Sequence, residues 1–150
     1  MTKVKRRVNK TMHDILFRAK RTNNGEWAYG YYIKTHDYLD NREIHLIVGI
    51  DSTSFPANEI TDTNEIDPET LGRYTELNDK HGIKIFEGDI VLKRTYQGKK
   101  PFPVSYHAGM FHCGWGGGSS TATHGYTLAD KQIEVIGNVY DNSELLEEKK

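Results

Sequence analysis

The sequence predicts a mainly β protein with minor α content, arranged as a small barrel with an N-terminal hairpin and a short C-terminal helix. Short apolar or aromatic runs recur along the 150 residues, separated by Gly, Asn, Asp or Pro. No segment keeps a helical apolar period over more than about ten residues. A chain of this length corresponds to one ordinary domain and is long enough to bury a core.

The N-terminal part is predicted to form a hairpin followed by a third strand. Residues 15–19 are a short apolar run, and residues 23–25 (Asn-Asn-Gly) are a turn signal because Asn and Gly tolerate positive φ. Residues 27–34 (WAYGYYIK) are rich in aromatics, which suit a half-buried strand. Residues 37–41 then predict a turn, and residues 44–50 (IHLIVGI) predict a buried strand.

The polar segment 51–68 contains two prolines and predicts a loop with one short strand near residues 59–60. At its end, residues 67–70 (DPET) predict a single helical turn, because Pro is favoured at the first helical position after an Asp cap. Extended structure is expected to resume over residues 71–77.

The following segments alternate short strands and turns. After a turn at Gly82, residues 84–86 predict a short strand, residues 87–89 (Glu-Gly-Asp) a tight turn, and residues 90–96 a longer strand. Residues 97–103 are basic and flanked by proline, and they predict a loop.

The C-terminal part is predicted to contain a hairpin, a loop, a strand and a helix. Residues 104–106 and 110–111 predict a hairpin that turns at Ala108 and Gly109. The glycine-rich segment 114–125 predicts a mobile loop, and residues 133–139 predict a final strand. Residues 144–150 predict a short helix capped by residues 141–143, with acids near its start and lysines at its end.

Composition describes a polar globular chain with a formal net charge of -1. That balance excludes a uniformly basic nucleic-acid binder but leaves a local basic patch open. The single cysteine, Cys113, excludes an intrachain disulfide and fits a reducing compartment. No apolar run reaches the roughly 18 residues that cross a bilayer, and no apolar stretch of a secretory signal follows the basic start. We therefore expect a cytoplasmic protein without membrane contact.

Charge is unevenly distributed along the chain. Residues 1–24 contain eight basic side chains and one acid, and residues 51–79 contain eight acids and one base. A phosphate-binding arm and an acidic face for a basic partner are the functional interpretations, and solvated segments are the structural one. We expect residues 1–11 to be a disordered basic arm and residues 12–147 to be one domain, with a division into 12–66 and 67–147 left open.

One long segment also carries a family resemblance. Residues 66–91 (IDPETLGRYTELNDKHGIKIFEGDIV) resemble the central signature of the YopX family of phage and prophage proteins. Residues 13–19 with the Tyr-Gly-Tyr at 29–31 resemble the family's opening, and residues 133–146 (IEVIGNVYDNSELL) resemble its close. Glu76 departs from the pattern, because the family usually has a glycine there.

The resemblance implies a small, mainly β protein encoded by a phage or prophage, and it supplies no catalytic residues. The turn into a strand at residues 88–91 is similar to that of SH3-like barrels, so we expect such a barrel in the C-terminal half. Glycine geometry, turn hydrogen bonding and the core explain the strongest positions of the family motif. These structural positions are Tyr74, Gly82, Phe86, Gly88 and Asp89.

Candidate chemical groups gather late in the chain. His107, His112, Cys113 and His124 include enough donors for a metal, but neighbours on a strand point to opposite faces and nothing forces convergence. Solvent-facing histidines and a half-buried cysteine are the preferred interpretation. Glu87 and Asp89 form a carboxylate pair that turn hydrogen bonding explains better than acid–base chemistry. We therefore predict no catalytic residue, no metal and no cofactor.

The function predicted first is a non-enzymatic accessory protein with an unknown phage or host protein as its partner. The alternative is a nucleic-acid-binding module, in which strand aromatics on one face provide stacking and basic residues contact phosphate. An enzyme centred on residues 107–125 is the third hypothesis. Homo-oligomerisation through exposed strand edges is also expected. The binding residues of the alternative are Lys5, Arg6, Arg7, Trp27, Tyr29, Tyr31, Lys93, Arg94, Lys99 and Lys100.

Overall fold

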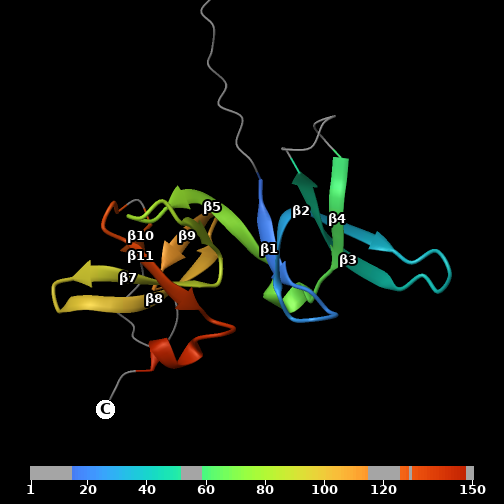
Figure 1. Cartoon of the computed structure of the whole chain (residues 1–150). Coiled ribbons are helices and arrows are strands. Elements are labelled where there is room, and N and C mark those ends of the chain that lie inside the picture. Colours follow the sequence, from blue (N-terminus) through green and yellow to red (C-terminus); the bar gives the residue numbers. More distant parts are fainter. Residues whose placement is uncertain (1–14, 52–58, 115–125, 129, 148–150) are drawn as a thin grey trace, which may run out of the picture.

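The computed structural model describes residues 15–51, 59–114, 126–128 and 130–147. Over these residues the chain forms eleven strands and two short 3-10 helices (Figure 1). The strands are β1 (Phe17–Lys20), β2 (Trp27–His36), β3 (Glu43–Asp51), β4 (Glu59–Glu65), β5 (Gly72–Asn78), β6 (Lys84–Phe86), β7 (Asp89–Thr95), β8 (Gly98–His107), β9 (Met110–Cys113), β10 (Tyr126–Thr127) and β11 (Glu134–Asn138). The helices are η1 (Pro68–Thr70) and η2 (Ser143–Leu146). The predicted mainly β class is confirmed.

The first sheet has the strand order β4-β3-β2-β1-β5-β6, and all its pairings are antiparallel. The predicted N-terminal hairpin is confirmed as β1 and β2, with Gly25 at a φ of 72° in the turn. One face of this sheet buries a small core of Ala19, Ala28, Ile47 and Ile66. The alternation of strand side chains therefore gives the N-terminal half an apolar core of its own.

The second sheet has the order β10-β9-β8-β7-β11 and is also antiparallel. Its core contains Val91, Val104 and Ile133 together with Ile85 of β6, so the β5–β6 hairpin packs against this sheet. The order of pairing ends at β10 and β11. The described strands therefore form an open sheet and not a closed barrel, because β6 pairs with β5 in the other sheet. The SH3-like arrangement stays a prediction.

Strand β5 connects the two halves (Figure 1). Gly72 and Arg73 pair with β1, whereas Tyr74 pairs with Phe86 of β6. The register shifts between Tyr74 and Asn78, and within that stretch Glu76 adopts a φ of 66°. The bulge bends the strand within the first sheet, beside the point where β6 packs against the second sheet.

Two predicted loops contain strands. β4 occupies residues 59–65, where only a short strand near residues 59–60 was expected. β8 begins at Gly98 although residues 97–103 were predicted to be a loop. Over residues 98–103 β8 pairs with β7 alone, so a proline can direct its missing N–H away from the ladder. The proline signal was therefore misread.

The helix predicted over residues 144–150 is not confirmed. The described chain has the 3-10 helix η2 over Ser143–Leu146, and Glu147 returns to extended backbone. Asn142 makes no capping hydrogen bond there, and the Asp141 carboxylate instead binds Lys20, Trp27 and Asn138. The predicted turn at residues 67–70 is confirmed as η1 with Asp67 as its cap. The arm 1–11 and most of the loop 114–125 lie outside the described residues.

Candidate functional site

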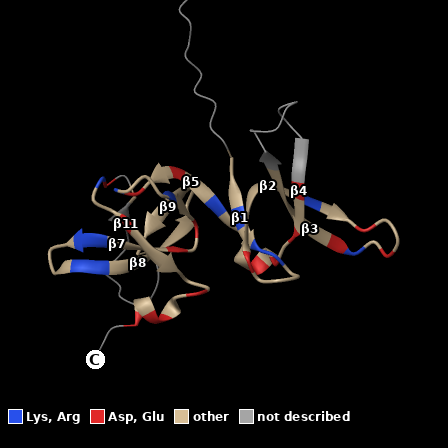
Figure 2. Ribbon diagram, viewed as in Figure 1, with Lys and Arg blue, Asp and Glu red and all other residues tan. Residues whose placement is uncertain are grey.

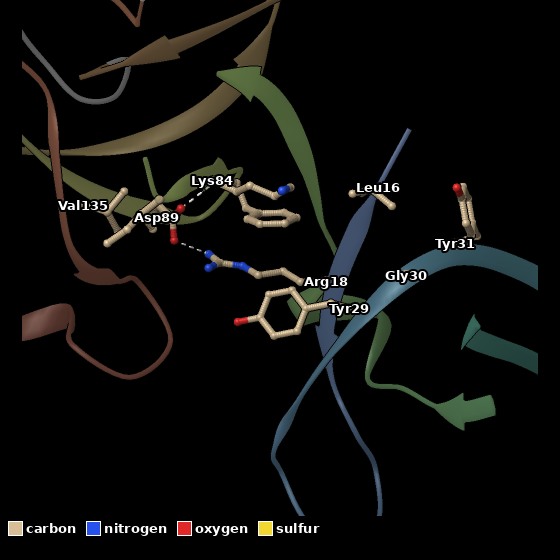
Figure 3. A pocket seen from close by; sticks show the side chains of 10 residues that line it. Leu16, Arg18, Tyr29, Gly30, Tyr31, Lys84, Asp89 and Val135 are labelled. Carbon is tan, nitrogen blue, oxygen red and sulfur yellow. Dashed lines mark hydrogen bonds and ion pairs between the residues drawn. The ribbon is translucent and has the colours of Figure 1, made fainter. Parts of the chain in front are cut away.

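A cleft of about 640 Å³ lies between the two halves of the molecule (Figure 3). β1 and β2 form one wall. The other wall consists of β6, β7 and β11, together with the end of the turn that precedes β6. Leu16, Ile83, Phe86 and Val135 give it apolar walls. Clefts of this size and character between packed units are common ligand sites in proteins.

Two tyrosines of β2, Tyr29 and Tyr31, line this cleft from the N-terminal half. Ala28 is buried, Tyr32 packs against the N-terminal core, and Tyr29 and Tyr31 are exposed on the opposite face. The Tyr29 ring lies 5.7 Å from the Phe86 ring, centroid to centroid. Trp27 shares their parity along the strand and packs against Tyr140 at 5.8 Å. The aromatic face predicted from the sequence therefore bridges the two halves.

An ion pair between Arg18 and Asp89 forms the polar floor of the cleft. Arg18 Nη2 lies 2.5 Å from Asp89 Oδ1, and the two side chains are 9% and 2% exposed. The second carboxylate oxygen accepts a hydrogen bond of 2.7 Å from the Phe86 amide. Burial raises the pKa of Asp89, and the Arg18 guanidinium and the Phe86 amide offset part of that rise. The two charges largely neutralise each other away from water.

Aromatic rings enclose the Arg18 guanidinium. Its Cζ lies 4.7 Å from the centroid of Trp27 and 5.1 Å from that of Phe86. Arg18 Nη2 also donates to the carbonyl of Glu87 at 3.4 Å, while its buried Nε has no hydrogen-bond partner among the described residues. Arg18 thus extends from β1 into the C-terminal half and holds the two halves together through charge and ring contacts.

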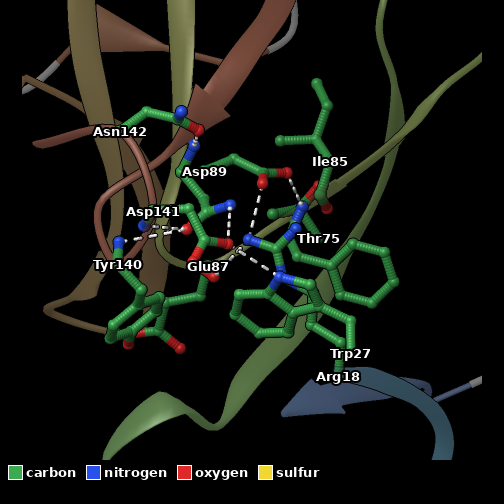
Figure 4. A network of polar contacts seen from close by, with 11 residues as sticks. Arg18, Trp27, Thr75, Ile85, Glu87, Asp89, Tyr140, Asp141 and Asn142 are labelled. Carbon is green, nitrogen blue, oxygen red and sulfur yellow. Dashed lines mark hydrogen bonds and ion pairs between the residues drawn. The ribbon is translucent and has the colours of Figure 1, made fainter. Parts of the chain in front are cut away.

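A second polar network lies beside the first (Figure 4). The Asp141 carboxylate accepts hydrogen bonds from Lys20 Nζ, from Trp27 Nε1 at 2.9 Å and from Asn138 Nδ2 at 3.1 Å. These hydrogen bonds, led by the one from Lys20, lower the pKa of Asp141 to about 2. The segment after β11 is therefore fastened to β1 and β2.

The turn that places Asp89 depends on Gly88. Its φ of 82° lies in the left-handed region, where side chains are disfavoured. A Cβ at this position would also lie 3.0 Å from the Tyr140 ring. The Gly88 amide donates to Val104, and its carbonyl accepts from Val139. Gly88 thus lets the backbone pass beneath Tyr140 and present Asp89 to Arg18.

The structure separates the predicted binding residues into different regions. Tyr29 and Tyr31 line the cleft, and Trp27 lies beside it. The four basic residues predicted in the C-terminal half lie on the β7–β8 hairpin. In Figure 1 this hairpin is at the end of the C-terminal half that points away from the N-terminal half. Lys93 is buried and paired with Asp130 at 2.8 Å, so it does not belong to an exposed surface. Lys5, Arg6 and Arg7 lie outside the described residues.

The late histidines and the cysteine do not form a recognisable metal site in the part of the chain that the structure describes. His124 lies outside it. Cys113 is fully buried in the C-terminal core, and burial raises the pKa of its thiol to about 11. A thiol in that state is protonated at neutral pH and is a weak nucleophile.

Sequence reasoning missed Arg18, Tyr140 and Asp141 as site residues. The only signal was a single base within the apolar run 15–19, which is unusual in a strand that packs on both sides. Local sequence did not mark Asp141 and Tyr140 as site residues, because the partners that place them beside the cleft, Trp27 and Glu69, lie more than 70 residues away along the chain.

The fold and the cleft define a mainly β protein with two antiparallel sheets and a ligand-sized cleft between them. A family model described as YopX protein matches residues 16–147, and the chain belongs to the YopX family. The resemblance inferred from residues 66–91 is therefore confirmed.

The fold is also similar to the crystal structure of protein EF1440 from Enterococcus faecalis, with a TM-score of 0.54 and 24% sequence identity. The match covers 91% of this chain and 100% of that one, and at this identity it shows a shared fold alone. No curated protein matches this chain. In its described part, no helix is long and apolar enough to cross a membrane.

Proposed function

We propose that this YopX-family protein is a non-enzymatic accessory protein, encoded by a phage or prophage, that binds a partner protein through the central cleft. The observation that carries the proposal is the cleft itself, with its volume of about 640 Å³, its apolar and aromatic walls and its exposed hydrophobic rim. Tyr29 is 56% exposed and Ile83 is 51% exposed at that rim. Contiguous exposed apolar surface of this kind marks interaction sites on soluble proteins.

The floor of the cleft favours an apolar ligand group. Arg18 and Asp89 satisfy each other at 2.5 Å, so the floor offers little net charge to an ionic ligand. The Tyr29 and Phe86 rings, with Leu16 and Val135, offer dispersion contacts and area for burial. An aliphatic or aromatic side chain of a partner segment, anchored between these walls, matches this chemistry.

Site-specific photocrosslinking tests the proposal. A benzophenone amino acid at Tyr31, in the cleft, should yield a discrete adduct in host cells that express the other phage genes. The same amino acid at Tyr38, which is 99% exposed in the turn after β2, serves as the control. Equal adducts at the two positions would count against a specific site.

The captured partner then permits a quantitative test. Ile83→Glu, at the rim, should weaken binding of the purified partner by about tenfold or more, because a carboxylate would be desolvated against an apolar group. Leu39→Glu, at an exposed apolar position away from the cleft, should leave the affinity unchanged. A partner indifferent to Ile83→Glu would remove the cleft as the binding site.

Other expectations from the sequence stay proposals. A cytoplasmic location and a homo-oligomer are among them, and light scattering on the purified chain would measure the second. β4 and β6 end the first sheet and β10 and β11 end the second, so copies would pair through one of these edges. The SH3-like description of the C-terminal half also remains a proposal.

A further inference from the structure

A second concave site lies beside the β7–β8 hairpin and shares no lining residue with the cleft. It encloses about 230 Å³ beside the β7–β8 hairpin, with Arg94 on β7, Lys99 on β8 and Glu134 on β11. Lys80, from the turn between β5 and β6, and Gln132 complete its polar lining. Figure 2 shows the basic residues of β7 and β8 side by side in this hairpin.

Positive charge exceeds negative charge in this pocket. Lys80 forms an ion pair with Glu134, and His81 Nε2 lies 3.7 Å from the same carboxylate. The hydrogen bond from Lys80, together with the charges of Lys80, His81 and Lys99, lowers the pKa of Glu134. One carboxylate thus interacts with several basic side chains. The pocket lining contains three basic residues and one acidic residue.

Arg94 and Lys99 are the two basic residues of this lining that form no direct ion pair in the described part of the chain. They are direct partners in the β7–β8 ladder, and both are exposed. Like charges directly opposite each other in an antiparallel pair repel, because their side chains leave the same face of the sheet. Within the described residues, neither makes an ion pair with an acid. The repulsion between Arg94 and Lys99 is electrostatically unfavourable in the free protein. An anion that bridges the two side chains would relieve that repulsion.

The neighbouring pair shows the compensated arrangement. Lys93 and Lys100 are also direct partners, but Lys93 points inward, is 9% exposed and pairs with Asp130 at 2.8 Å. One lysine of that pair is therefore neutralised inside the protein. The contrast indicates that the open charges of Arg94 and Lys99 are directed at something outside the chain.

An exposed aromatic lies at the tip of the same hairpin. Tyr96 is 91% exposed in the turn between Thr95 and Gly98. An exposed tyrosine beside basic side chains is a combination that binds single-stranded nucleic acid. The basic side chains contact phosphate, and the tyrosine ring stacks on a nucleobase. We propose that the pocket of Lys80, Arg94 and Lys99 binds a phosphate of single-stranded nucleic acid, with Tyr96 stacked on an adjacent base.

Fluorescence anisotropy with a labelled oligonucleotide of about 15 deoxythymidines tests the proposal across a range of salt concentrations. The double variant Arg94→Gln/Lys99→Gln in the full chain should weaken binding by about tenfold at about 50 mM salt. The slope of log affinity against log salt should fall by about 0.7, since the two side chains hold one phosphate and each neutralised phosphate contributes about 0.7 on a single strand.

Lys34→Gln/Arg42→Gln is the matched control. It removes the same charge from exposed positions of the N-terminal half and should change the affinity by less than about twofold. Tyr96→Ala should weaken binding by about tenfold with the salt slope unchanged, whereas Tyr38→Ala should have no effect. Melting temperatures of all variants verify that each remains folded.

Three results would overturn the proposal. The first is no binding of the oligonucleotide at about 20 mM salt, where phosphate contacts are strongest. The second is an equal loss in the two double variants, which would show attraction to overall charge and not to this pocket. The third is displacement by thymidine monophosphate at the concentration at which unlabelled oligonucleotide competes, which would make the ligand a nucleotide. None of these outcomes depends on crosslinking in the cleft.

Discussion

The central cleft and the β7–β8 hairpin both combine an arginine with aromatic rings, but the two arginines are in opposite electrostatic situations. Arg18 is buried, ion-paired with Asp89 and enclosed by the rings of Trp27 and Phe86. Arg94 is exposed and faces Lys99 across the ladder. A neutralised charge holds two halves of a protein together, whereas an exposed like-charged pair is available to a ligand. The same residue type therefore serves architecture in one region and, as proposed, recognition in the other.

Removing the carboxylate from the cleft should give the largest effect. Asp89→Ala leaves the Arg18 guanidinium buried without its counter-charge and the Phe86 amide without its acceptor. Breaking a buried ion pair from one side costs about 3–5 kcal/mol of unfolding free energy, which urea denaturation would measure.

The double variant Arg18→Met/Asp89→Asn provides the control for that measurement. It removes both charges together, so it should be more stable than Asp89→Ala. A loss below about 1 kcal/mol for Asp89→Ala would mean that water reaches the pair and that the cleft does not differ from the hairpin in this respect.

The second comparison concerns two glycines with left-handed backbone, one beside the cleft and one in the β7–β8 hairpin. Gly88 has a φ of 82° beneath the Tyr140 ring, and Gly98 has a φ of 106° at the hairpin turn with open space around it. Gly98→Ala should cost only the backbone strain, about 1–2 kcal/mol. Gly88→Ala adds a contact of 3.0 Å with Tyr140 and should cost about 1 kcal/mol more.

Thermal melting of both variants measures that difference. Gly88→Ala should cost less in a Tyr140→Ala background than in the wild type, whereas Gly98→Ala should cost the same in both. Equal losses at the two glycines would show that the turn next to the cleft is as free to move as the hairpin tip.

The network beside the cleft predicts a dependence of stability on pH. The hydrogen bonds from Lys20 and Trp27 to the Asp141 carboxylate lower its folded pKa to about 2, below the usual value for an aspartate. A lowered folded pKa stabilises the protein above the unfolded pKa, and this stabilisation is lost as pH falls through about 4 to 2. The Asp141 side chain is 38% exposed, so we discount its contribution to about 1 kcal/mol.

Denaturant titrations at pH values from about 6 to 2 would measure this dependence. Asp141→Asn should be less stable than the wild type at pH 6, and the difference should vanish near pH 2. Glu147→Gln, at an exposed carboxylate further along the chain, should leave the curve unchanged. A gap between wild type and Asp141→Asn that persists near pH 2 would show that the asparagine disturbs packing and not charge.

Local signals in the sequence predicted the elements that depend on local chemistry. The Asn-Asn-Gly turn gave the β1–β2 hairpin, and the Asp-Pro pair gave the 3-10 helix η1 with Asp67 as its cap. Prolines led to an incorrect loop over residues 97–103, because a strand with one neighbour tolerates them.

The cleft could not be predicted in the same way. It forms where β1 and β2 meet β6, β7 and β11, and its central pair joins Arg18 to Asp89, 71 residues further along the chain. The place of Arg18 within the apolar run 15–19 sets it apart locally but does not indicate which residue it pairs with. The prediction of a C-terminal helix was wrong for the same reason. The Asp141 carboxylate, which was expected to cap that helix, binds Lys20 and Trp27 instead.

Strand β5, which connects the two halves, contains a strained position that the sequence analysis had noted. Glu76 stands where the YopX family usually has a glycine, and its φ of 66° lies in the left-handed region. Glu76→Gly should relieve about 1–2 kcal/mol of strain at a glycine entropy cost of about 0.5–1 kcal/mol, a net gain of about 0.5–1 kcal/mol. The contact with Arg73 at 4.0 Å is partly exposed and contributes little. Glu76→Ala keeps the strain, so urea denaturation should show no gain for it.

The smallest expected effect is a gain of stability in the hairpin. Arg94→Gln removes the repulsion across the ladder from Lys99 and should stabilise the protein by about 0.3 kcal/mol at low salt. Because the charges are exposed, the gain should disappear at about 1 M salt, where the screening length falls to about 3 Å. Chemical denaturation by urea, which adds no ions, would measure both conditions. Loss of stability in Arg94→Gln at low salt would mean that an internal acid already neutralises this arginine, and the hairpin would then resemble the cleft.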